Sequence, residues 1–324
     1  MIQRASFAAL IFSALSTVTL ACDTTPIKWK TLTFINKAEV NLHSFLTFTA
    51  RKPETLPQLT TQLSDTDKQS LQNAVTQYQT FTKQKRFHPL FNNNELAHMT
   101  EWFGNNKPLV EIDTTALSQS YFATIGLYKA HIWPTHCKQN MQWQTQLQNK
   151  LDVYGDKINQ RLSELFLGEL ISVPEHRVYI HARPFTRQGA FTSARQFVTH
   201  MNSYQATNND WYALELLFHE ISHVPFYLNK QLQHNIEQVF SDYGIAQHSR
   251  IWHPILFFTV GEVTRQAIAK ANPDYQPYAN KVNLYKGKWH YLKELEQHWQ
   301  PYINGQVSMD EALHNLAKAI KERT

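Results

Sequence analysis

The sequence predicts an α+β protein that is mainly helical. Glycine makes up only 9 of the 324 residues, which favours long regular elements over many tight turns. Most segments repeat apolar residues with the period of a helix, whereas strand-like segments are short and concentrate after Pro174. An apolar stretch without glycine or proline, residues 211–218, follows these strands. We therefore expect a small mixed or antiparallel sheet that leads directly into a buried helix.

The first half of the chain is predicted to be mostly helical. Short strands are expected at residues 31–34 and 42–49, where apolar and β-branched residues dominate. Helices are expected at residues 65–82, 94–103 and 114–132. A longer helix is expected at residues 134–170, with a break near Tyr154 and Gly155. This half of the chain carries no motif that indicates a chemical function.

The pattern changes in the second half. Strands are expected at residues 177–182, 189–193 and 196–202. The apolar stretch then predicts a helix over residues 210–224, which Pro225 should end. Residues 254–263 are apolar on nearly every face, which predicts a second buried helix. A capping box at residues 308–311 opens the last expected helix, residues 309–321.

The most informative motif lies within the expected 210–224 helix. His219, Glu220 and His223 form the pattern H-E-x-x-H. Two histidines four residues apart project from one face of a helix, so both imidazoles can reach a single tetrahedral ion. Glu220 lies one step around the helix and can act as a base toward a water molecule on the metal without being a ligand. The competing interpretation is a buried helix whose two histidines are simply hydrogen-bonded.

Strands that lead into an H-E-x-x-H helix resemble the zincin metallopeptidases. The resemblance implies a catalytic Zn²⁺, a peptide or protein substrate, and an edge strand before the helix that aligns the substrate backbone. Residues 196–202 are the expected edge strand, with His200 in the pocket. The metzincin branch adds a glycine and then a third histidine, six residues after the second. Phe226 and Asn229 stand at those positions, so this branch is excluded.

The gluzincin branch, which this chain resembles more closely, implies a glutamate ligand from a second helix. Glu262 is the predicted third ligand, because a lone carboxylate in the apolar 254–263 helix is costly unless it is paired or bound to a metal. Gly261 beside it removes a side chain where two helices could approach closely. An ion pair between Glu262 and Arg265 is the competing interpretation, and Asp242 is the alternate ligand.

Such a site would hydrolyse amide bonds. Zinc held by His219, His223 and Glu262 would acidify water and polarise the substrate carbonyl. Glu220 would take the proton of the attacking water and pass it to the leaving amine. The oxyanion that forms needs a further donor. The downstream candidates for this donor are His253, Arg265, Tyr275 and Tyr278.

Residues 1–21 have the pattern of a secretory signal. Arg4 supplies a positive charge, residues 5–20 are apolar and uncharged, and small residues around Ala21 offer a cleavage site. We therefore expect export to the periplasm or cell envelope, or secretion. Cys22 follows the cleavage site, which predicts a lipid anchor. A disulfide between Cys22 and Cys137, the only other cysteine, is the alternative.

The charge of the chain excludes one class of partner. The sequence contains 31 Lys+Arg and 26 Asp+Glu, and removal of Arg4 with the signal leaves 30 against 26, a net charge of +4. This small surplus contains no Lys/Arg-rich run, so we expect no nucleic-acid partner.

Two organisations and two functions stay open. The mature chain is expected to contain a helical region at residues 22–170 and a zincin-like catalytic region at residues 171–324, or one continuous domain at residues 22–324. The predicted function is that of an exported zinc metallopeptidase. The alternative is a non-catalytic envelope protein, with a binding or structural role, on the same scaffold.

Overall fold

The computed structural model of the chain describes residues 26–83, 88–89, 94–108, 111–186, 189–287 and 289–323. The expected signal at residues 1–21 and Cys22 lie outside these residues. The lipid anchor and the Cys22–Cys137 disulfide therefore stay predictions. None of the helices in the described part of the chain combines the length and the apolar character that a membrane crossing needs.

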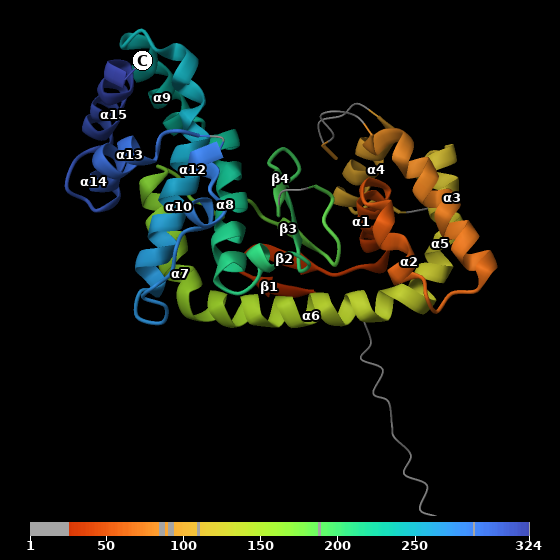
Figure 1. The fold of residues 1–324 in the computed structure, drawn as a ribbon. Helices are drawn as coiled ribbons and strands as arrows, with labels where there is room; N and C mark the ends of the chain where they lie inside the picture. The colour runs from red at the N-terminus through yellow and green to blue at the C-terminus, as the bar shows by residue number, and fades with distance from the viewer. Residues whose placement is uncertain are drawn as a thin grey trace, which may run out of the picture.

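A five-stranded mixed sheet lies in the middle of the molecule (Figure 1). Its strands, in spatial order, are β1 (Ile27–Trp29), β2 (Leu32–Ile35), β3 (His176–His181), β5 (Val198–Asn202) and β4 (Phe191–Ser193). The three inner strands run parallel, and β1 and β4 are antiparallel edge strands. The sheet thus combines strands from both halves of the chain, with Leu32 opposite His176.

Helices make up most of the remaining structure. The first half contains α1 (Ala38–Arg51), η1 (Pro53–Thr55), α2 (Leu56–Leu59), α3 (Asp65–Thr82), α4 (Glu95–Gly104), α5 (Ala116–Leu127), η3 (Tyr128–Ile132), α6 (Trp133–Lys150), η4 (Leu151–Gly155) and α7 (Asp156–Leu165). The second half begins with η5 (Ala206–Asn208), α8 (Trp211–Leu228), α9 (Gln231–Asp242), η6 (Ala246–Ile251) and α10 (Trp252–Ile268). It ends with α11 (Tyr278–Lys281), α12 (Leu284–Gly287), α13 (Leu292–Glu294), η7 (Leu295–Trp299), α14 (Gln300–Ile303) and α15 (Met309–Arg323).

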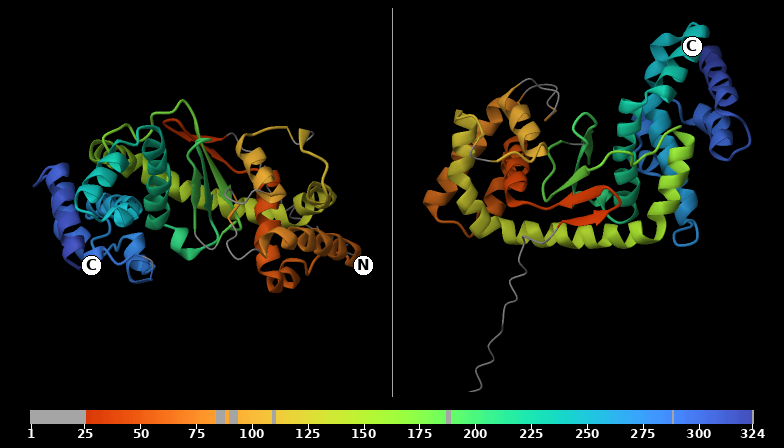
Figure 2. Two further views of the ribbon diagram at one scale, coloured as in Figure 1. Left: turned by 90° about the horizontal axis from the view of Figure 1, so that it is seen from above. Right: turned by 180° about the vertical axis from the view of Figure 1, so that it is seen from behind.

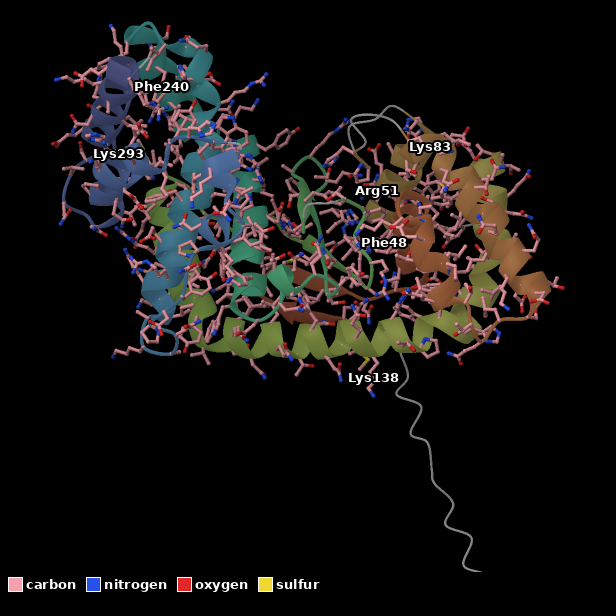
Figure 3. All side chains as sticks on the ribbon, viewed as in Figure 1. Phe48, Arg51, Lys83, Lys138, Phe240 and Lys293 are labelled. Carbon is pink, nitrogen blue, oxygen red and sulfur yellow. The ribbon has the colours of Figure 1, made fainter. Side chains whose placement is uncertain are left out.

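The helices form two groups on either side of the sheet. Helices α1, α3, α4 and α5 lie on one side, and α8, α9, α10 and α15 lie on the other (Figures 1 and 2). Each group encloses its own apolar core; Phe45 and Tyr78 are fully buried in one, and Phe218 and Phe240 in the other. Side chains fill the interior of both groups (Figure 3). Helix α6 runs along the sheet and connects the two sides. The mainly helical α+β fold expected from the sequence is confirmed.

The expected break in the long helix is a π-helical segment. Helices α6 and α7 flank η4, which ends at Gly155. A Cβ atom at Gly155 would lie 2.5 Å from the Trp29 ring. Glycine suits this position, because the Trp29 ring of strand β1 packs directly against the helix and would have to shift to admit a Cβ atom.

One expected strand is wrong. Residues 42–49 belong to helix α1, in which nearly every residue is buried. Because a helix that is buried on all faces shows no helical period, its apolar and β-branched residues resemble a strand in the sequence. The Thr47 and Thr49 hydroxyls donate to the carbonyls of His43 and Phe45, four residues back, at 2.8 Å each. Tertiary packing thus overrides the local β preference.

Pro225 does not end its helix, contrary to expectation. Helix α8 continues to Leu228, and the Asn229 N–H donates to the Pro225 carbonyl at 2.8 Å. Because proline lacks an N–H, it removes only one hydrogen bond here, and the last turn tolerates that loss.

Candidate metal centre

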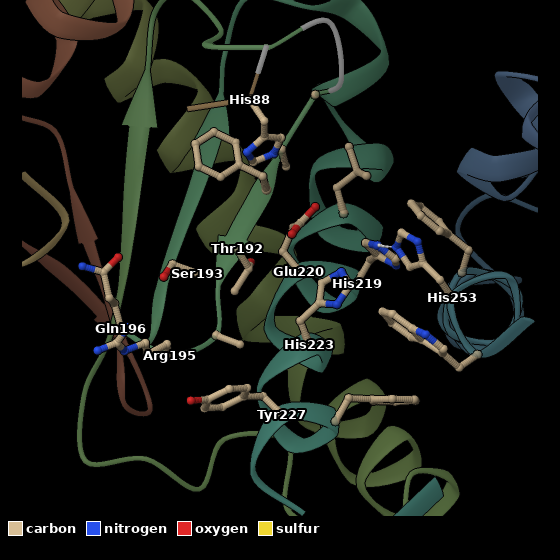
Figure 4. Close-up of a pocket in the computed structure, with 18 of the residues that line it drawn as sticks. His88, Thr192, Ser193, Arg195, Gln196, His219, Glu220, His223, Tyr227 and His253 are labelled. Carbon is tan, nitrogen blue, oxygen red and sulfur yellow. Dashed lines mark hydrogen bonds between the residues drawn. The ribbon is translucent and has the colours of Figure 1, made fainter. Parts of the chain in front are cut away.

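Helix α8 carries the H-E-x-x-H motif along the floor of a cleft. Most of its residues from Ala213 to Phe226 are buried, because the helix packs between the sheet and α10. His219 and Glu220 are only 1% and 5% exposed, and His223 is half-buried. All three residues line the cleft (Figure 4). The predicted motif helix is confirmed.

A third histidine completes a metal-ligating group. His253 lies at the start of α10, which crosses α8 beside the motif. Among the residues that the structure describes, His219, His223 and His253 form the one group of three potential ligands, with ligand atoms all within 4.8 Å of one another. This group could hold a metal ion.

The spacing of the imidazoles fits a tetrahedral ion. The Nε2 atoms of His219 and His253 lie 3.4 Å apart. In a zinc site with Zn–N distances of about 2.0–2.1 Å, two ligand nitrogens lie roughly 3.3–3.4 Å apart. The two helices therefore hold these nitrogens at the separation of one edge of such a tetrahedron.

Burial favours the neutral form, which a metal requires, in His219 and His223. Burial lowers the pKa of His219 well below its usual range, and the neighbouring His223 and His253 lower it further. Burial lowers the pKa of His223 to about 4. Neutral imidazoles have a lone pair to donate to a cation. The His219 Nδ1 atom is buried and has no hydrogen-bond partner among the described residues.

Glu220 lies beside the three histidines but outside their group. Burial raises the pKa of its carboxyl group to about 8, and a hydrogen bond with the side chain of Thr192 opposes this increase. Thr192 belongs to the edge strand β4 and lines the cleft beside Glu220 of α8 (Figure 4). A carboxyl group with a perturbed pKa in a cleft, next to potential metal ligands, is a candidate functional group.

The cleft itself has a volume of about 860 Å³. Its walls come from both helical groups. Helix α4 contributes Ala97, His98 and Glu101, and β4 with its following turn contributes residues 191–196. The opposite wall, beside His253, is aromatic and includes Phe257 and Trp289. Helix α4 of the N-terminal group thus forms part of one side of the cleft, a role that the sequence did not indicate.

The structure corrects the predicted third ligand. Glu262 is not part of the histidine group; it accepts three hydrogen bonds from the Arg265 guanidinium at 2.6–3.1 Å. This ion pair is the competing interpretation of the sequence, and it satisfies the buried carboxylate without a metal. The alternate ligand, Asp242, is exposed at the end of α9 and accepts from Gln238. His253 takes the place that the sequence assigned to these acids.

Gly261 lies where α10 approaches two neighbours closely. A Cβ atom there would lie 3.2 Å from the carboxylate of Glu215 on α8, so the expected approach of two helices is present. It would also lie 2.7 Å from Pro277, in the segment that contains Tyr275 and Tyr278, which both donate to Glu215.

Among the four candidate oxyanion donors, only two line the cleft. His253 joins the histidine group, and Tyr278 lies in the wall next to Phe257. The Tyr275 hydroxyl donates to Glu215, and Arg265 is paired with Glu262. Tyr278 is thus the one candidate that lines the cleft without being a potential ligand.

The expected edge strand is also corrected. Strand β5, which contains residues 198–202, pairs with β3 on one side and β4 on the other. It has no free edge for a substrate. Strand β4 is the edge, and it lines the cleft next to α8. His200 is buried away from the cleft, with its Nδ1 atom 2.9 Å from the His181 Nε2 atom.

Comparison with protein-family models, curated proteins and solved structures finds no match to this chain.

The contribution of His253 was the main feature that sequence reasoning missed. His253 follows Trp252 and precedes Pro254, directly before the apolar helix. The sequence indicated His253 only as a candidate oxyanion donor, because the gluzincin resemblance implies an acid as the third ligand. The sequence signal for the third potential ligand was a histidine at the beginning of the second buried helix, rather than an acid within that helix.

Proposed function

We propose that this protein is a zinc-dependent hydrolase, most specifically a metallopeptidase that cleaves peptide amide bonds. The observation that supports the proposal best is the convergence of three imidazoles from two helices, with Glu220 beside them in a cleft. Two of the imidazoles belong to H-E-x-x-H, and the third takes the place of the gluzincin glutamate. A set of nitrogen ligands favours Zn²⁺ over Mg²⁺ or Ca²⁺, which prefer oxygen.

His219, His223 and His253 would hold the ion and leave a fourth position open toward the cleft. When bound, zinc would supply Lewis acidity toward a carbonyl oxygen and toward water. Glu220 would accept the proton of the attacking water and deliver it to the leaving amine. The Tyr278 hydroxyl, in the cleft wall, would donate to the developing oxyanion.

Strand β4 would align the substrate. Its outer edge has no partner strand among the described residues, and it lies beside the motif helix. A peptide could add to this edge as a sixth strand, so that its backbone runs past the histidines. This arrangement is the one expected of a zincin, with β4 in place of the strand predicted from the sequence.

Metal analysis and peptide hydrolysis with wild-type protein and Glu220→Gln test the proposal. We expect one zinc per chain in both proteins, and a loss of turnover in the variant of about 10²–10⁴-fold, the usual contribution of a general base. Glu294→Gln is the matched control, because Glu294 is a buried carboxylate paired with Arg323 outside the cleft. It should keep full activity.

Two results would contradict the proposal. A wild-type protein that binds no zinc would remove the metal site. A protein that binds zinc but cleaves no peptide in a broad panel would favour the non-catalytic envelope protein on the same scaffold.

A further inference from the structure

A buried carboxylate joins helix α8 to the wall of the cleft. Glu215 is only 1% exposed, and the Tyr278 N–H donates to both of its carboxylate oxygens, at 3.0 Å each. The Tyr275 hydroxyl donates to the same carboxylate. Glu215 precedes His219 by one helical turn, so both side chains project from the same face of α8. The carboxylate thus connects the segment that contains the two tyrosines to the helix of the candidate metal centre.

Aromatic contacts connect Tyr278 with the histidine group. The Tyr278 ring stacks with the Phe257 ring, with centroids 6.2 Å apart and planes inclined by 16°. The Phe257 ring in turn stacks with the His219 imidazole, with centroids 3.4 Å apart and planes inclined by 23°. Tyr278 and Phe257 both line the cleft. Tyr278 is therefore held at two points, its backbone by Glu215 and its ring by Phe257.

Helix α10 leaves space for this arrangement at Gly261. A Cβ atom there would lie 3.2 Å from a carboxylate oxygen of Glu215 and 2.7 Å from Pro277, the residue before Tyr278. A methyl group at this position would therefore have to displace the proline ring or the carboxylate. The position of Tyr278 thus depends on close contact between α8, α10 and residues 275–278.

We propose that Glu215 is a positioning residue for Tyr278, whose hydroxyl it holds where the oxyanion develops. The inference rests on the proposed function, which assigns the oxyanion donor to Tyr278. A buried carboxylate is costly unless hydrogen bonds satisfy it, and Tyr275 and Tyr278 supply these bonds to Glu215. Because Glu215 fixes the backbone of Tyr278, the hydroxyl is in place before the reaction begins. Glu215 itself lies outside the histidine group.

The Tyr278 amide tests this anchor without any need for activity. Nitrogen-15 NMR of tyrosine-labelled protein observes the amide, and its signal can be assigned by its absence in Tyr278→Phe. We expect slow hydrogen exchange at this amide in the wild type, and a shifted signal with faster exchange in Glu215→Gln. Glu294→Gln, which changes a buried carboxylate paired with Arg323, should leave the signal unchanged. A Tyr278 amide that is also unchanged in Glu215→Gln would overturn the proposal.

Kinetics separate a positioning role from a purely structural one. We expect Tyr278→Phe to lower kcat by about 10²-fold, the usual contribution of an oxyanion donor. Glu215→Gln should lower kcat by about tenfold, while KM and zinc affinity stay within about twofold. In the Tyr278→Phe background, Glu215→Gln should change kcat by less than about twofold, because no hydroxyl is left to position. An equal loss in the two backgrounds would contradict the proposal.

A second variant disturbs the anchor but keeps the carboxylate, and it decides the case if Glu215→Gln does not fold. Gly261→Ala displaces the neighbours of Gly261, so we expect a loss of kcat that again disappears in the Tyr278→Phe background. Gly126→Ala in α5 is the matched control, because a Cβ atom there meets no atom of the described residues within 4 Å. It should keep full kcat. No loss in Gly261→Ala, or an equal loss in the two backgrounds, would contradict the proposal.

The proposed function and the positioning role would fail in different ways. A wild-type protein without turnover would remove both. Full turnover in Tyr278→Phe would remove the oxyanion donor and the role of Glu215, but would leave the hydrolase. A low kcat in Tyr278→Phe, together with equal losses for Glu215→Gln in the two backgrounds, would remove only the role of Glu215.

Discussion

Buried histidines occur in two regions of this protein, and their partners differ. In the N-terminal helical group, His43 lies 2.9 Å from the Tyr78 hydroxyl through Nδ1 and 2.9 Å from the Thr100 hydroxyl through Nε2. In the candidate metal centre, His219 faces the imidazole of His253, and its Nδ1 atom has no partner among the described residues. Both histidines are almost completely buried.

The two regions differ in whether hydroxyl groups meet the hydrogen-bonding needs of the buried imidazoles. The hydroxyls around His43 can donate or accept as the imidazole requires, so the site is complete and contributes stability. Three imidazoles that face one another have surplus lone pairs, which a cation can use. Burial of histidine therefore does not identify a metal site by itself; the chemistry of the partners does.

The pair of His181 and His200 is an intermediate case. Their facing nitrogens lie 2.9 Å apart, a normal hydrogen-bond distance for one N–H and one lone pair. No third ligand joins them in the part of the chain that the structure describes. The two facing nitrogens satisfy each other, but the buried His181 Nδ1 atom has no hydrogen-bond partner among the described residues, like the His219 Nδ1 atom. The third imidazole, rather than an unpaired Nδ1 atom, therefore distinguishes the candidate metal centre.

Exchanging one histidine in each region gives the largest expected effect. His253→Ala should lower zinc affinity by at least about 100-fold, or roughly 2.7 kcal/mol, because it removes one of three ligands. His43→Gln should leave zinc affinity unchanged and instead lower the free energy of unfolding of the metal-free protein by about 1–3 kcal/mol. Zinc titration and urea unfolding measure the two quantities. Equal zinc affinity in wild type and His253→Ala would break the comparison.

Both regions should contribute to the response to acid, because burial lowers the pKa of His219 and His223 as well as that of His43. Burial lowers the pKa of His43 to about 3, so the folded state binds fewer protons than the unfolded state below pH 6.5. Stability is therefore present above pH 6.5 and falls as the pH decreases toward 3. Between pH 6 and pH 4.5, His43 alone should account for about 2 kcal/mol of the loss.

Urea unfolding of metal-free protein at several pH values measures this loss. His43→Gln removes the titrating group, so its free energy of unfolding should depend less steeply on pH than that of the wild type. Parallel curves for the two proteins would show that His43 does not remain neutral in the folded state.

The sequence predicted those parts of the fold that depend on local pattern. Helix α3 occurs over the expected residues 65–82, where Ser64 accepts the N-terminal hydrogen bond of the helix from Asp67. The break at Gly155 and the motif helix were also predicted correctly. Helix α1 was predicted incorrectly, because its residues are buried on every face and its apolar residues therefore show no helical period.

The candidate site also has one part that local sequence patterns predict and another part that they do not. His219, Glu220 and His223 are adjacent in sequence, so helical spacing alone places them together. His253 reaches the same point through the packing of α10 on α8, which no local pattern encodes. Glu262 was predicted as a ligand because a buried carboxylate is costly unless it is paired or bound to a metal. Arg265 on the same helix supplies that pairing. Sequence patterns do not show which of two favourable pairings tertiary structure selects.

Glu262→Gln tests whether the Glu262 carboxylate has a structural role or is a metal ligand. Because the Arg265 side chain is 43% exposed, the ion pair should be worth about 1 kcal/mol, well below the value of a fully buried pair. We expect the free energy of unfolding to fall by about that amount, while zinc affinity stays within twofold. A large loss of zinc affinity would restore Glu262 as a ligand and contradict the histidine group.

The smallest effect is expected at Asp242, the other acid that the sequence offered as a ligand. Asp242 is exposed at the end of α9, and its partner Gln238 lies one turn earlier on the same helix at 2.8 Å. An exposed hydrogen bond of this kind competes with water, so Asp242→Asn should change stability by less than about 0.5 kcal/mol. Zinc affinity and peptide turnover should not change. Since an asparagine oxygen is a much weaker zinc ligand than a carboxylate, any measurable loss of zinc would mean that α9 moves toward the histidines when the metal binds.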